Sequence, residues 1–286
     1  MKQMPSIVSF LIPFASKKVK KNWVKACDDL QATLSSILNS TNPNLNVVIV
    51  GNEYPTFNVE SDSRVKFISL DSHSNVQHDS VISGRLDILR KMKSAYQYAD
   101  QNFKPSYFMR CDADDLISNR LVQWLETAPS SPGFLINLGW VWDQNKYLIQ
   151  YSERHDRMCG TCLVIRNDYA KKEGPFLTNV DGVEFNEEQL AFSYKDKYSL
   201  IPGSKNTSIL FNDSHTRFAA QFKYFGVDVK KIPFAAVVYK IRNQDSLSFK
   251  FDDRINKKYT FRECLGKWRR MRFISKKLKA EFALME

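Results

Sequence analysis

The chain has 286 residues and is 43% hydrophobic, which is enough to bury the core of one large α/β domain with a small appendage. Its 42 basic and 31 acidic residues give a formal net charge of +11, but no zinc-finger, helix-turn-helix or RNP-like motif accompanies the charge, so no nucleic-acid partner is expected. The five cysteines form no regular framework, which argues against a disulfide-stapled secreted fold and favours the cytoplasm.

The N-terminal segment has some features of a signal peptide, because Lys2 precedes an apolar run at residues 7–12. That run is short, it ends at Pro13, and the same residues serve well as a buried first strand. Nothing in the chain approaches the roughly 18 consecutive apolar residues of a membrane-spanning helix. The sequence therefore predicts a protein that is soluble or bound to a membrane surface.

The first half of the chain alternates strand-like and helix-like segments, which is typical of a sheet with helical crossovers. Short apolar runs indicate buried parallel strands, and apolar residues at helical spacing indicate helices packed on them. The expected strands are residues 6–12, 46–50, 64–70 and 107–110, and the expected helices are residues 28–38 and 80–100.

After Asn119 a short helix is expected, and the pattern then becomes richer in strands. Strands are predicted at residues 134–142, 147–151, 159–166 and 235–241, with a helix at residues 217–226. Three aromatic residues, Trp140, Trp142 and Tyr151, gather in this half. Because sugar faces pack well on such rings, this half is predicted to bind a carbohydrate acceptor.

The most informative motif follows the expected strand at residues 107–110, where Asp112, Asp114 and Asp115 come in close succession. Alternate side chains of an extended chain share a face, so Asp112 and Asp114 can point the same way. Carboxylate oxygens suit Mg²⁺ or Mn²⁺, and the natural partner of such an ion is a diphosphate. A solvated turn or a helix cap is the alternative interpretation.

With these residues in place, the chain resembles the GT-A-type nucleotide-sugar glycosyltransferases of the family-2-like group over residues 6–248. The acid motif at residues 110–117 is similar to that family's Asp-x-Asp-Asp motif. The helix with Thr-Leu-Ser-Ser-Ile-Leu at residues 33–38, the strand at residues 47–50 and the segments at residues 225–233 and 239–242 follow in the family's order. The resemblance implies an α/β fold of the GT-A type: a Rossmann-like mixed sheet flanked by helices, as in nucleotide-diphospho-sugar transferases.

The resemblance also implies roles for individual residues. Asp114 is expected to bind Mn²⁺ or Mg²⁺, and Asp112 to bind the ribose or the metal. Three positions depart from the family pattern. Gly-Asn-Glu at residues 51–53 stands in place of an acidic pair that contacts the base, and Asn-Asp-Ser-His at residues 212–215 stands where a Glu-Asp general base is usual. A C-terminal His that often completes the family's metal site is replaced near Arg242. The candidates for contact with the nucleotide are Phe14, Ala15, Glu53 and Arg85. Asp213 is the candidate general base, and His215 is an alternative base or a third metal ligand. Glu187 and Glu188 are other candidate bases.

The predicted function is therefore a metal-dependent, inverting transfer of a sugar from a nucleotide-diphosphate donor to a hydroxyl of a glycan or lipid-linked acceptor. The alternatives are a retaining transferase or nucleotidyltransferase, and a non-catalytic carbohydrate- or nucleotide-binding protein with a degenerate fold. The expected domain spans residues 1–250, with a nucleotide-sugar half at residues 1–118 and an acceptor half at residues 119–250.

Residues 251–286 are predicted to form a basic helical tail, because Phe261, Leu265, Trp268 and further apolar residues fall on one helical face with the charges mainly elsewhere. One interpretation is a helix on an anionic membrane surface, so that the protein is peripheral on the inner face. The other is a helix docked on the domain. Cys159 and Cys162 are interpreted as structural thiols rather than half of a zinc site, and His155 as a surface residue.

Overall fold

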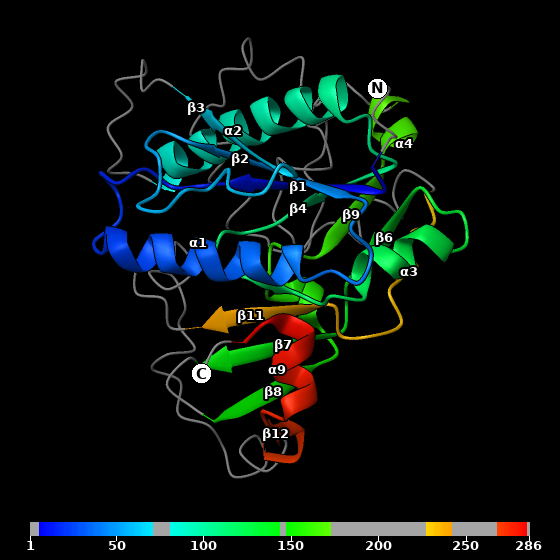
Figure 1. Ribbon diagram of the computed structural model, residues 1–286. Helices are drawn as coiled ribbons and strands as arrows, with labels where there is room; N and C mark the ends of the chain where they lie inside the picture. The colour runs from blue at the N-terminus through cyan, green and yellow to red at the C-terminus, as the bar shows by residue number, and fades with distance from the viewer. Residues whose placement is uncertain (1–5, 71–80, 144–146, 173–226, 242–267, 285–286) are drawn as a thin grey trace.

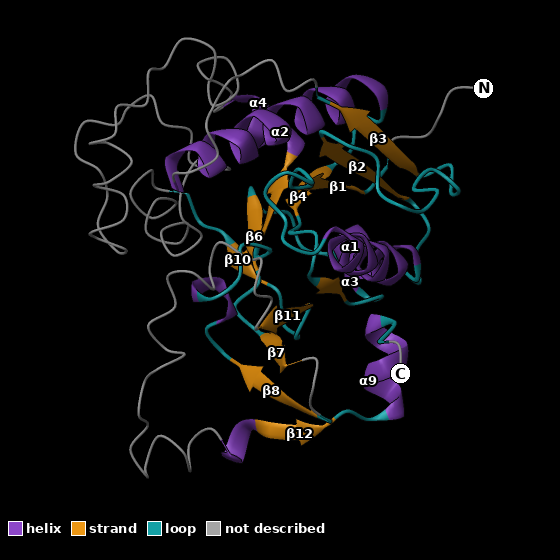
Figure 2. Ribbon diagram, turned by 90° about the vertical axis from the view of Figure 1, so that its left-hand side faces the viewer, coloured by secondary structure: helices purple, strands orange, loops and turns teal. Residues whose placement is uncertain are grey.

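The computed structural model describes residues 6–70, 81–143, 147–172, 227–241 and 268–284. Two β-sheets and their helices build this part of the chain (Figure 1). Helix α2 (Val81–Asn102) covers the outer face of the larger sheet, and helix α1 (Trp23–Leu38) lies between the larger and the smaller sheet (Figure 2). The fold is a mixed α/β arrangement in which helices flank the sheets, as the sequence predicts.

Within the described residues, the large sheet has seven strands in the order β10-β6-β9-β4-β1-β2-β3. Strands β1, β2, β3 and β4 run parallel, whereas β9 is antiparallel to both β4 and β6. These four neighbouring strands therefore deliver their carboxyl ends to one edge, where ligands bind in open α/β sheets. The strands are β1 (Val8–Pro13), β2 (Leu45–Gly51), β3 (Val65–Ser69), β4 (Tyr107–Arg110), β6 (Gly133–Leu135), β9 (Leu163–Arg166) and β10 (Lys230–Lys231).

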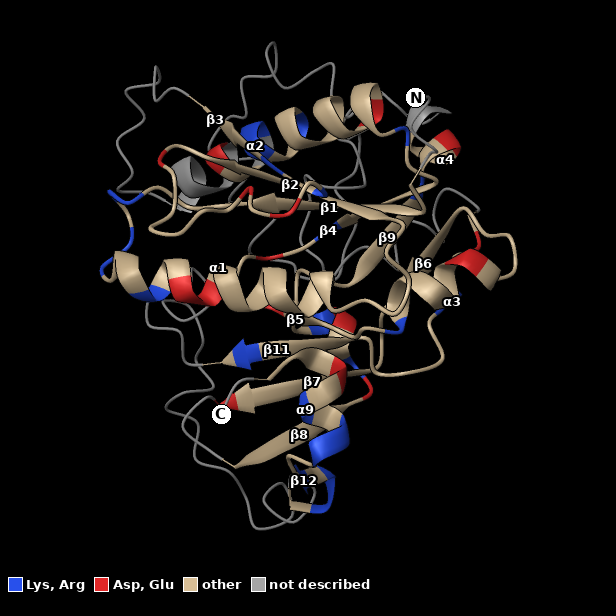
Figure 3. Ribbon diagram, in the orientation of Figure 1, with Lys and Arg blue, Asp and Glu red and all other residues tan. Residues whose placement is uncertain are grey.

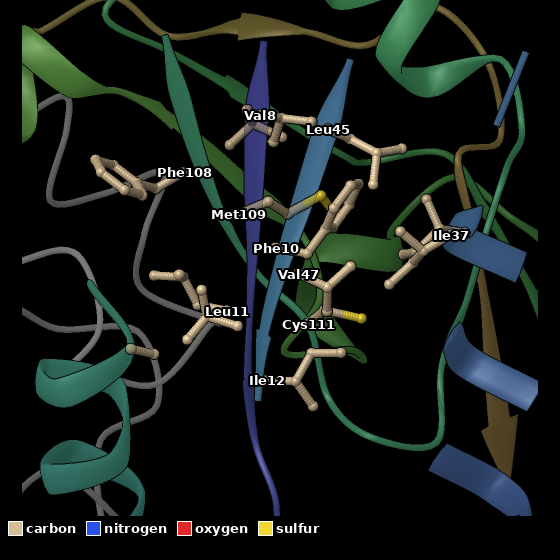
Figure 4. Packing of buried hydrophobic residues seen from close by; sticks show 14 of the residues in the cluster. Val8, Phe10, Leu11, Ile12, Ile37, Leu45, Val47, Phe108, Met109 and Cys111 are labelled. Atoms are coloured by element: carbon tan, nitrogen blue, oxygen red, sulfur yellow. The ribbon is translucent and has the colours of Figure 1, made fainter. Parts of the chain in front are cut away.

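The central strands are buried on both faces, which explains why they are almost continuously apolar. In β1, Phe10 packs on the α1 side and Leu11 on the other side, and neither is exposed (Figure 4). Val47 of β2 and Cys111, just after β4, join Phe10 against Ile37 of α1 (Figure 4). The large sheet and its two helices thus form one main core.

Helix α1 is buried along two rows, which suits its place between the sheets. It begins earlier than the predicted residue 28, because the side chain of Asn22 caps the helix by accepting a hydrogen bond from the Lys25 amide at 3.0 Å. An apolar row packs on the large sheet, and a polar row of Asp29, Thr33 and Ser36 is also buried. The polar row faces the segment that follows β4, as the hydrogen bonds described below show.

The described part of the small sheet has five strands in the order β12-β8-β7-β11-β5. They are β5 (Leu116–Ile117), β7 (Gly139–Asp143), β8 (Leu148–Ser152), β11 (Val237–Ile241) and β12 (Met271–Phe273). The shorter helical segments are α3 (Leu121–Thr127), η1 (His155–Arg157), α4 (Asn167–Lys172) and α9 (Lys276–Phe282). A second, smaller core joins Leu116, Ile149 and Val238 of this sheet to Phe282 and Leu284 at the end of the chain.

Two sequence predictions in this half are wrong. The single strand expected at residues 134–142 is divided between β6 in the large sheet and β7 in the small one. The chain changes sheets where Asn137 accepts a hydrogen bond from the His155 amide at 2.9 Å. His155 is not a surface residue but fully buried, because its ring packs so closely on Gly139 that a Cβ there would lie 2.3 Å from Nδ1.

The predicted tail is not a single helix. Within its described part, residues 268–284, β12 pairs antiparallel with β8 before α9 begins. Helix α9 is then fixed to the body of the protein, since Phe282 is fully buried and Glu281 accepts hydrogen bonds from Ser118 at 2.6 Å and from Arg120 at 2.8 Å. For α9 the docked interpretation is therefore correct. No helix in the described ranges is long and apolar enough to cross a membrane.

A strained residue, Lys104, lies two residues after the end of helix α2 and gives a stability prediction. Lys104 has φ 47°, a left-handed conformation that disfavours any Cβ, and its amide donates to the Ala99 carbonyl at 3.1 Å. We expect Lys104→Gly to raise the free energy of unfolding by about 0.5–1 kcal/mol, since relief of strain exceeds the added entropy of the unfolded chain. Urea denaturation measures this. Lys104→Ala is the control and should bring no gain, whereas an equal gain from alanine would mean that the lysine side chain itself destabilises the fold.

Candidate functional site

The segment of residues 111–115, here called the acid loop, begins where β4 ends. Strand β4 lies between β1 and β9 in the large sheet, so the acid loop emerges near the centre of the edge formed by the parallel strand ends. Asp112 and Asp114 are partly exposed, whereas Asp115 is 1% exposed. The loop thus presents two carboxylates outward and keeps the third inside.

The buried polar row of α1 holds the backbone on both sides of Asp114. The Thr33 hydroxyl donates to the Ala113 carbonyl at 2.9 Å, and the Ser36 hydroxyl accepts from the Ile117 amide at 3.0 Å. The Cys111 amide donates to the Leu11 carbonyl of β1 at 2.9 Å. Because these partners belong to packed elements, the acid loop is positioned by rigid structure.

A second set of contacts comes from residues 159–162, which precede β9 and therefore lie beside the end of β4. The Thr161 hydroxyl accepts from the Asp112 amide at 2.8 Å and donates to Asp115 Oδ2 at 2.5 Å. The Cys159 thiol donates to the same carboxylate oxygen at 3.0 Å. Thr161 therefore connects the backbone at Asp112 to the buried Asp115.

Asp115 has an electrostatic environment that opposes its charge. Burial, together with the neighbouring carboxylates of Asp114 and Asp112, raises the pKa of Asp115 well above its ordinary value. Burial also raises the pKa of the Cys159 thiol, which is consistent with its role as a hydrogen-bond donor. These groups support the loop from inside.

The Asp112 carboxylate is confined on two sides. Its Oδ1 accepts from Arg110 Nη2 at 3.1 Å and from Arg110 Nε at 3.3 Å. Its Oδ2 lies against Gly160, where an added Cβ would be 2.6 Å away. Arg110 and Gly160 thus fix the direction of Asp112, and any larger residue at position 160 would displace it.

The nucleotide candidates near the ends of β1 and β2 come together in the structure. The two carboxylate oxygens of Glu53 accept from the Ser16 hydroxyl at 3.0 Å and the Lys17 amide at 2.9 Å, so Glu53 joins the two loops. Phe14 is buried, with its ring 5.1 Å from that of Trp23, and Ala15 beside it is partly exposed. Contact of Phe14, Ala15 or Glu53 with a nucleotide base stays a prediction.

Three further candidates fall outside what the structure describes. Arg85 belongs to α2, but its side chain is not described. Asp213 and His215 both lie in residues 173–226, outside the described ranges, and so do the alternative bases Glu187 and Glu188. Their roles stay predictions.

The aromatic residues of the acceptor half lie on the small sheet. Trp140 of β7 and Tyr151 of β8 are cross-strand partners with ring centroids 5.2 Å apart. Trp140 and Trp142 are partly buried against the second core, which includes Phe282. Part of this aromatic surface therefore stabilises the docking of the chain end, rather than facing a ligand.

Several contacts of the acid loop could not be recognised in the sequence. In the sequence, Thr33 and Ser36 are simply polar positions on a helix. Gly160 and Thr161 are simply the two residues between the cysteines of a Cys-x-x-Cys pair. The same is true of Lys240 in β11, which is 4% exposed and donates to Asp29 Oδ1 of α1 at 3.1 Å. The one available signal was the helical spacing of Asp29, Thr33 and Ser36, which places three polar residues on one side of α1.

The donor set of the acid loop fits a divalent cation that shares its coordination with a ligand. No cluster of three or more His, Cys, Asp or Glu residues suited to a metal occurs within the described residues. Mg²⁺ is usually held by one or two carboxylates together with substrate phosphates and water, not by a complete cage of protein ligands. Asp114 and Asp112 provide such a pair of hard oxygen donors.

Comparisons with known proteins find two solved structures that match much of this chain at low identity. No family model and no curated protein matches the chain. TarS residues 1–349 from S. aureus match with a TM-score of 0.39 and 12% identity, over 82% of this chain but only 60% of the TarS chain. A protein from Desulfovibrio desulfuricans G20, provisionally named a nucleotide-diphospho-sugar transferase, matches with a TM-score of 0.39 and 13% identity, over 82% of this chain and 81% of that one.

Proposed function

We propose that this chain is a metal-dependent, inverting glycosyltransferase of the GT-A type. It moves a sugar from a nucleotide-diphosphate donor to a hydroxyl of a glycan or lipid-linked acceptor. The observation that carries the proposal is the acid loop, in which two outward carboxylates stand at the carboxyl end of a central parallel strand. Anchors from α1 and from Thr161 hold that loop in place.

In this proposal Asp114 is the principal ligand of Mn²⁺ or Mg²⁺, and Asp112 contacts the same ion or the donor ribose. The ion would stabilise the negative charge that develops on the leaving diphosphate. Arg110 keeps Asp112 oriented, and Asp115 fixes the loop through Thr161. Phe14, Ala15, Glu53 and Arg85 are the proposed contacts of the nucleotide.

Inversion requires a base on the side of the sugar opposite the leaving group, which takes the proton of the acceptor hydroxyl. Asp213 is the proposed base, with His215 as the alternative or as a third metal ligand. A proton NMR determination of the product's anomeric configuration tests this step. A product that keeps the donor's configuration would remove both the inverting mechanism and the role of Asp213.

A second candidate is a non-catalytic protein that binds a nucleotide or carbohydrate. The observation that favours it is the ion pair between Arg110 and Asp112, because a carboxylate already neutralised by a guanidinium is a weaker metal ligand. This candidate predicts ligand binding that does not depend on a divalent cation.

A thermal-shift screen of UDP-, GDP-, CMP- and dTDP-sugars, each with and without Mn²⁺, separates the two. A ligand that binds only the folded state at about 100 times its dissociation constant adds about 2.7 kcal/mol to stability. For a chain of this size, that corresponds to a rise of roughly 4–5 °C in Tm. We expect such a rise with one nucleotide and only with Mn²⁺, whereas a rise that is equal without the metal would favour the binding protein.

A further inference from the structure

The segment that enters and forms β12 has an unusual surface. Among the described residues, the three most exposed large apolar side chains are Tyr147 at 89%, Phe273 at 81% and Trp268 at 76%. Tyr147 directly precedes β8 and Phe273 lies in β12, and their backbones are adjacent because the Ile274 amide donates to the Tyr147 carbonyl at 3.1 Å and Phe273 is the cross-strand partner of Leu148. Trp268 precedes β12 by three residues.

Positive charge accompanies these aromatic residues. Residues 268–280 contain six basic side chains and no acidic one, and Arg269, Arg270, Arg272, Lys276 and Lys277 are exposed. Figure 3 shows this basic group over β12 and α9, at the opposite side of α1 from the large sheet. We call the surface formed by Tyr147 and residues 268–277 the β12 surface.

We propose that the β12 surface binds the face of an anionic lipid bilayer. Exposed aromatic side chains enter the boundary between head groups and acyl chains, and arginine and lysine side chains bind the anionic head groups. The partly exposed Met271 adds a flexible apolar side chain beside the aromatic rings, whereas Ile274 and Leu278 pack against the second core. Such a side chain is suited to acyl chains but does not stack on nucleic-acid bases, so a bilayer fits this surface better than RNA.

A second copy of the chain is a poorer fit. Among the described strands, β12 lies at the edge of the small sheet, but it has only three residues and carries Arg272 at its centre. Short edge strands with charged residues are the usual means of preventing pairing between sheets. Strand β12 is therefore not a suitable template for dimerisation.

The surface is rigidly connected to the acid loop. Helix α9 holds it to the body through Phe282, through Glu281, which accepts from Ser118 and Arg120, and through the Ala280 carbonyl, which accepts from Asn39 at 2.9 Å. Strand β5, which follows the acid loop directly, is at the opposite edge of the small sheet from β12. Four strand spacings separate the two edges, or roughly 19 Å.

Membrane binding would thus place the acid loop at a defined height above the bilayer. At that height it can reach the head group of a lipid-linked acceptor while the nucleotide-sugar enters from water. This last step rests on the transferase function proposed above, whereas lipid binding itself does not.

Flotation of the full chain with vesicles, without donor or metal, tests the proposal. We expect binding to phosphatidylglycerol-rich vesicles and none to pure phosphatidylcholine. Trp268→Ser with Phe273→Ser should lower the partition coefficient by about tenfold or more. Arg269→Gln with Arg270→Gln should lower it by about fivefold per charge, roughly 25-fold in total.

Matched controls exist elsewhere on the surface. Val19→Ser with Val24→Ser removes two side chains that are 40% and 60% exposed, and Lys18→Gln with Lys21→Gln removes two exposed cations from another basic loop. Both controls should change binding less than twofold. Absence of binding by the intact chain, or equal losses from the controls, would overturn the proposal.

Two further measurements would show that the β12 surface binds something other than a bilayer. Binding of single-stranded RNA that is lost in the Trp268 and Phe273 variant, with no vesicle binding, would assign the surface to nucleic acid. A dimer in light scattering that the same variant dissociates would assign it to a second copy of the chain. Either result overturns the lipid proposal, and neither bears on the sugar transfer, which is measured with donor and Mn²⁺ in solution.

Discussion

Replacing Asp114 with alanine is expected to abolish the Mn²⁺-dependent donor shift and to lower sugar transfer by roughly 10²–10³-fold, the usual cost of removing one group that stabilises transition-state charge. The reason is local. Asp114 is partly exposed within a loop whose backbone is anchored on both sides, at Ala113 by Thr33 and at Ile117 by Ser36. The substitution therefore removes a carboxylate without releasing the loop.

Three observations check this prediction. The Asp114→Ala protein should remain folded with a cooperative unfolding transition, because the backbone anchors at Ala113 and Ile117 are unchanged. Asp62→Ala is the control for loss of an acid, since Asp62 is partly exposed, pairs with Arg64 at 2.7 Å and precedes β3, three strands from β4. It should keep the donor shift. An Asp114→Ala protein that still shows the full Mn²⁺-dependent shift would contradict the assignment of Asp114 as a ligand.

The acid loop could be predicted from sequence because its signals are local. A buried parallel strand is apolar on both faces, so the change from Tyr107–Arg110 to three acids marks both a strand end and a candidate site. The order of strands and helices before it then indicates which strand is central. These features depend on residues that are neighbours in the sequence, so they can be recognised without knowledge of the fold.

The parts of the site that could not be predicted depend on contacts between distant segments. Thr161 is 49 residues from Asp112 along the chain, and Thr33 is 80 residues from Ala113. A threonine in such positions has the same sequence pattern as one at a solvated surface. His155 was misjudged for a related reason, since its burial depends on Gly139 providing space in another strand.

The division of residues 134–142 between two sheets was missed because both strands are apolar and nearly continuous. Only Asn137 and Gly139 interrupt the run, and neither is a strong strand terminator. The position of β12 was missed for a different reason. Residues 268–284 have helical spacing of apolar residues, but pairing with β8 overrides that local preference at residues 271–273.

Gly160 gives the sharpest test of how the acid loop is supported. We expect Gly160→Ala to weaken Mn²⁺-dependent donor binding by about 10–100-fold, which is typical for groups that orient metal ligands. An added Cβ would lie 2.6 Å from Asp112 Oδ2 and 3.5 Å from Arg110 Nη2. Because the obstructed atom belongs to a partly exposed side chain, Asp112 can rotate away, so the fold is kept while the carboxylate loses its direction.

Gly133→Ala is the matched control, because its added Cβ would meet backbone. The Cβ would lie 2.8 Å from the Val164 carbonyl oxygen in the ladder between β6 and β9. Overpacking of that kind costs typically 1–3 kcal/mol of stability, yet Asp112 is untouched.

The two variants should therefore have opposite effects. Gly160→Ala lowers donor affinity at nearly constant Tm, and Gly133→Ala lowers Tm at nearly constant donor affinity. Calorimetric titration with donor and Mn²⁺, together with thermal unfolding, measures both quantities. Unchanged affinity in Gly160→Ala would mean that the direction of Asp112 set by Arg110 and Gly160 has no part in donor binding, and that Asp114 alone holds the ion.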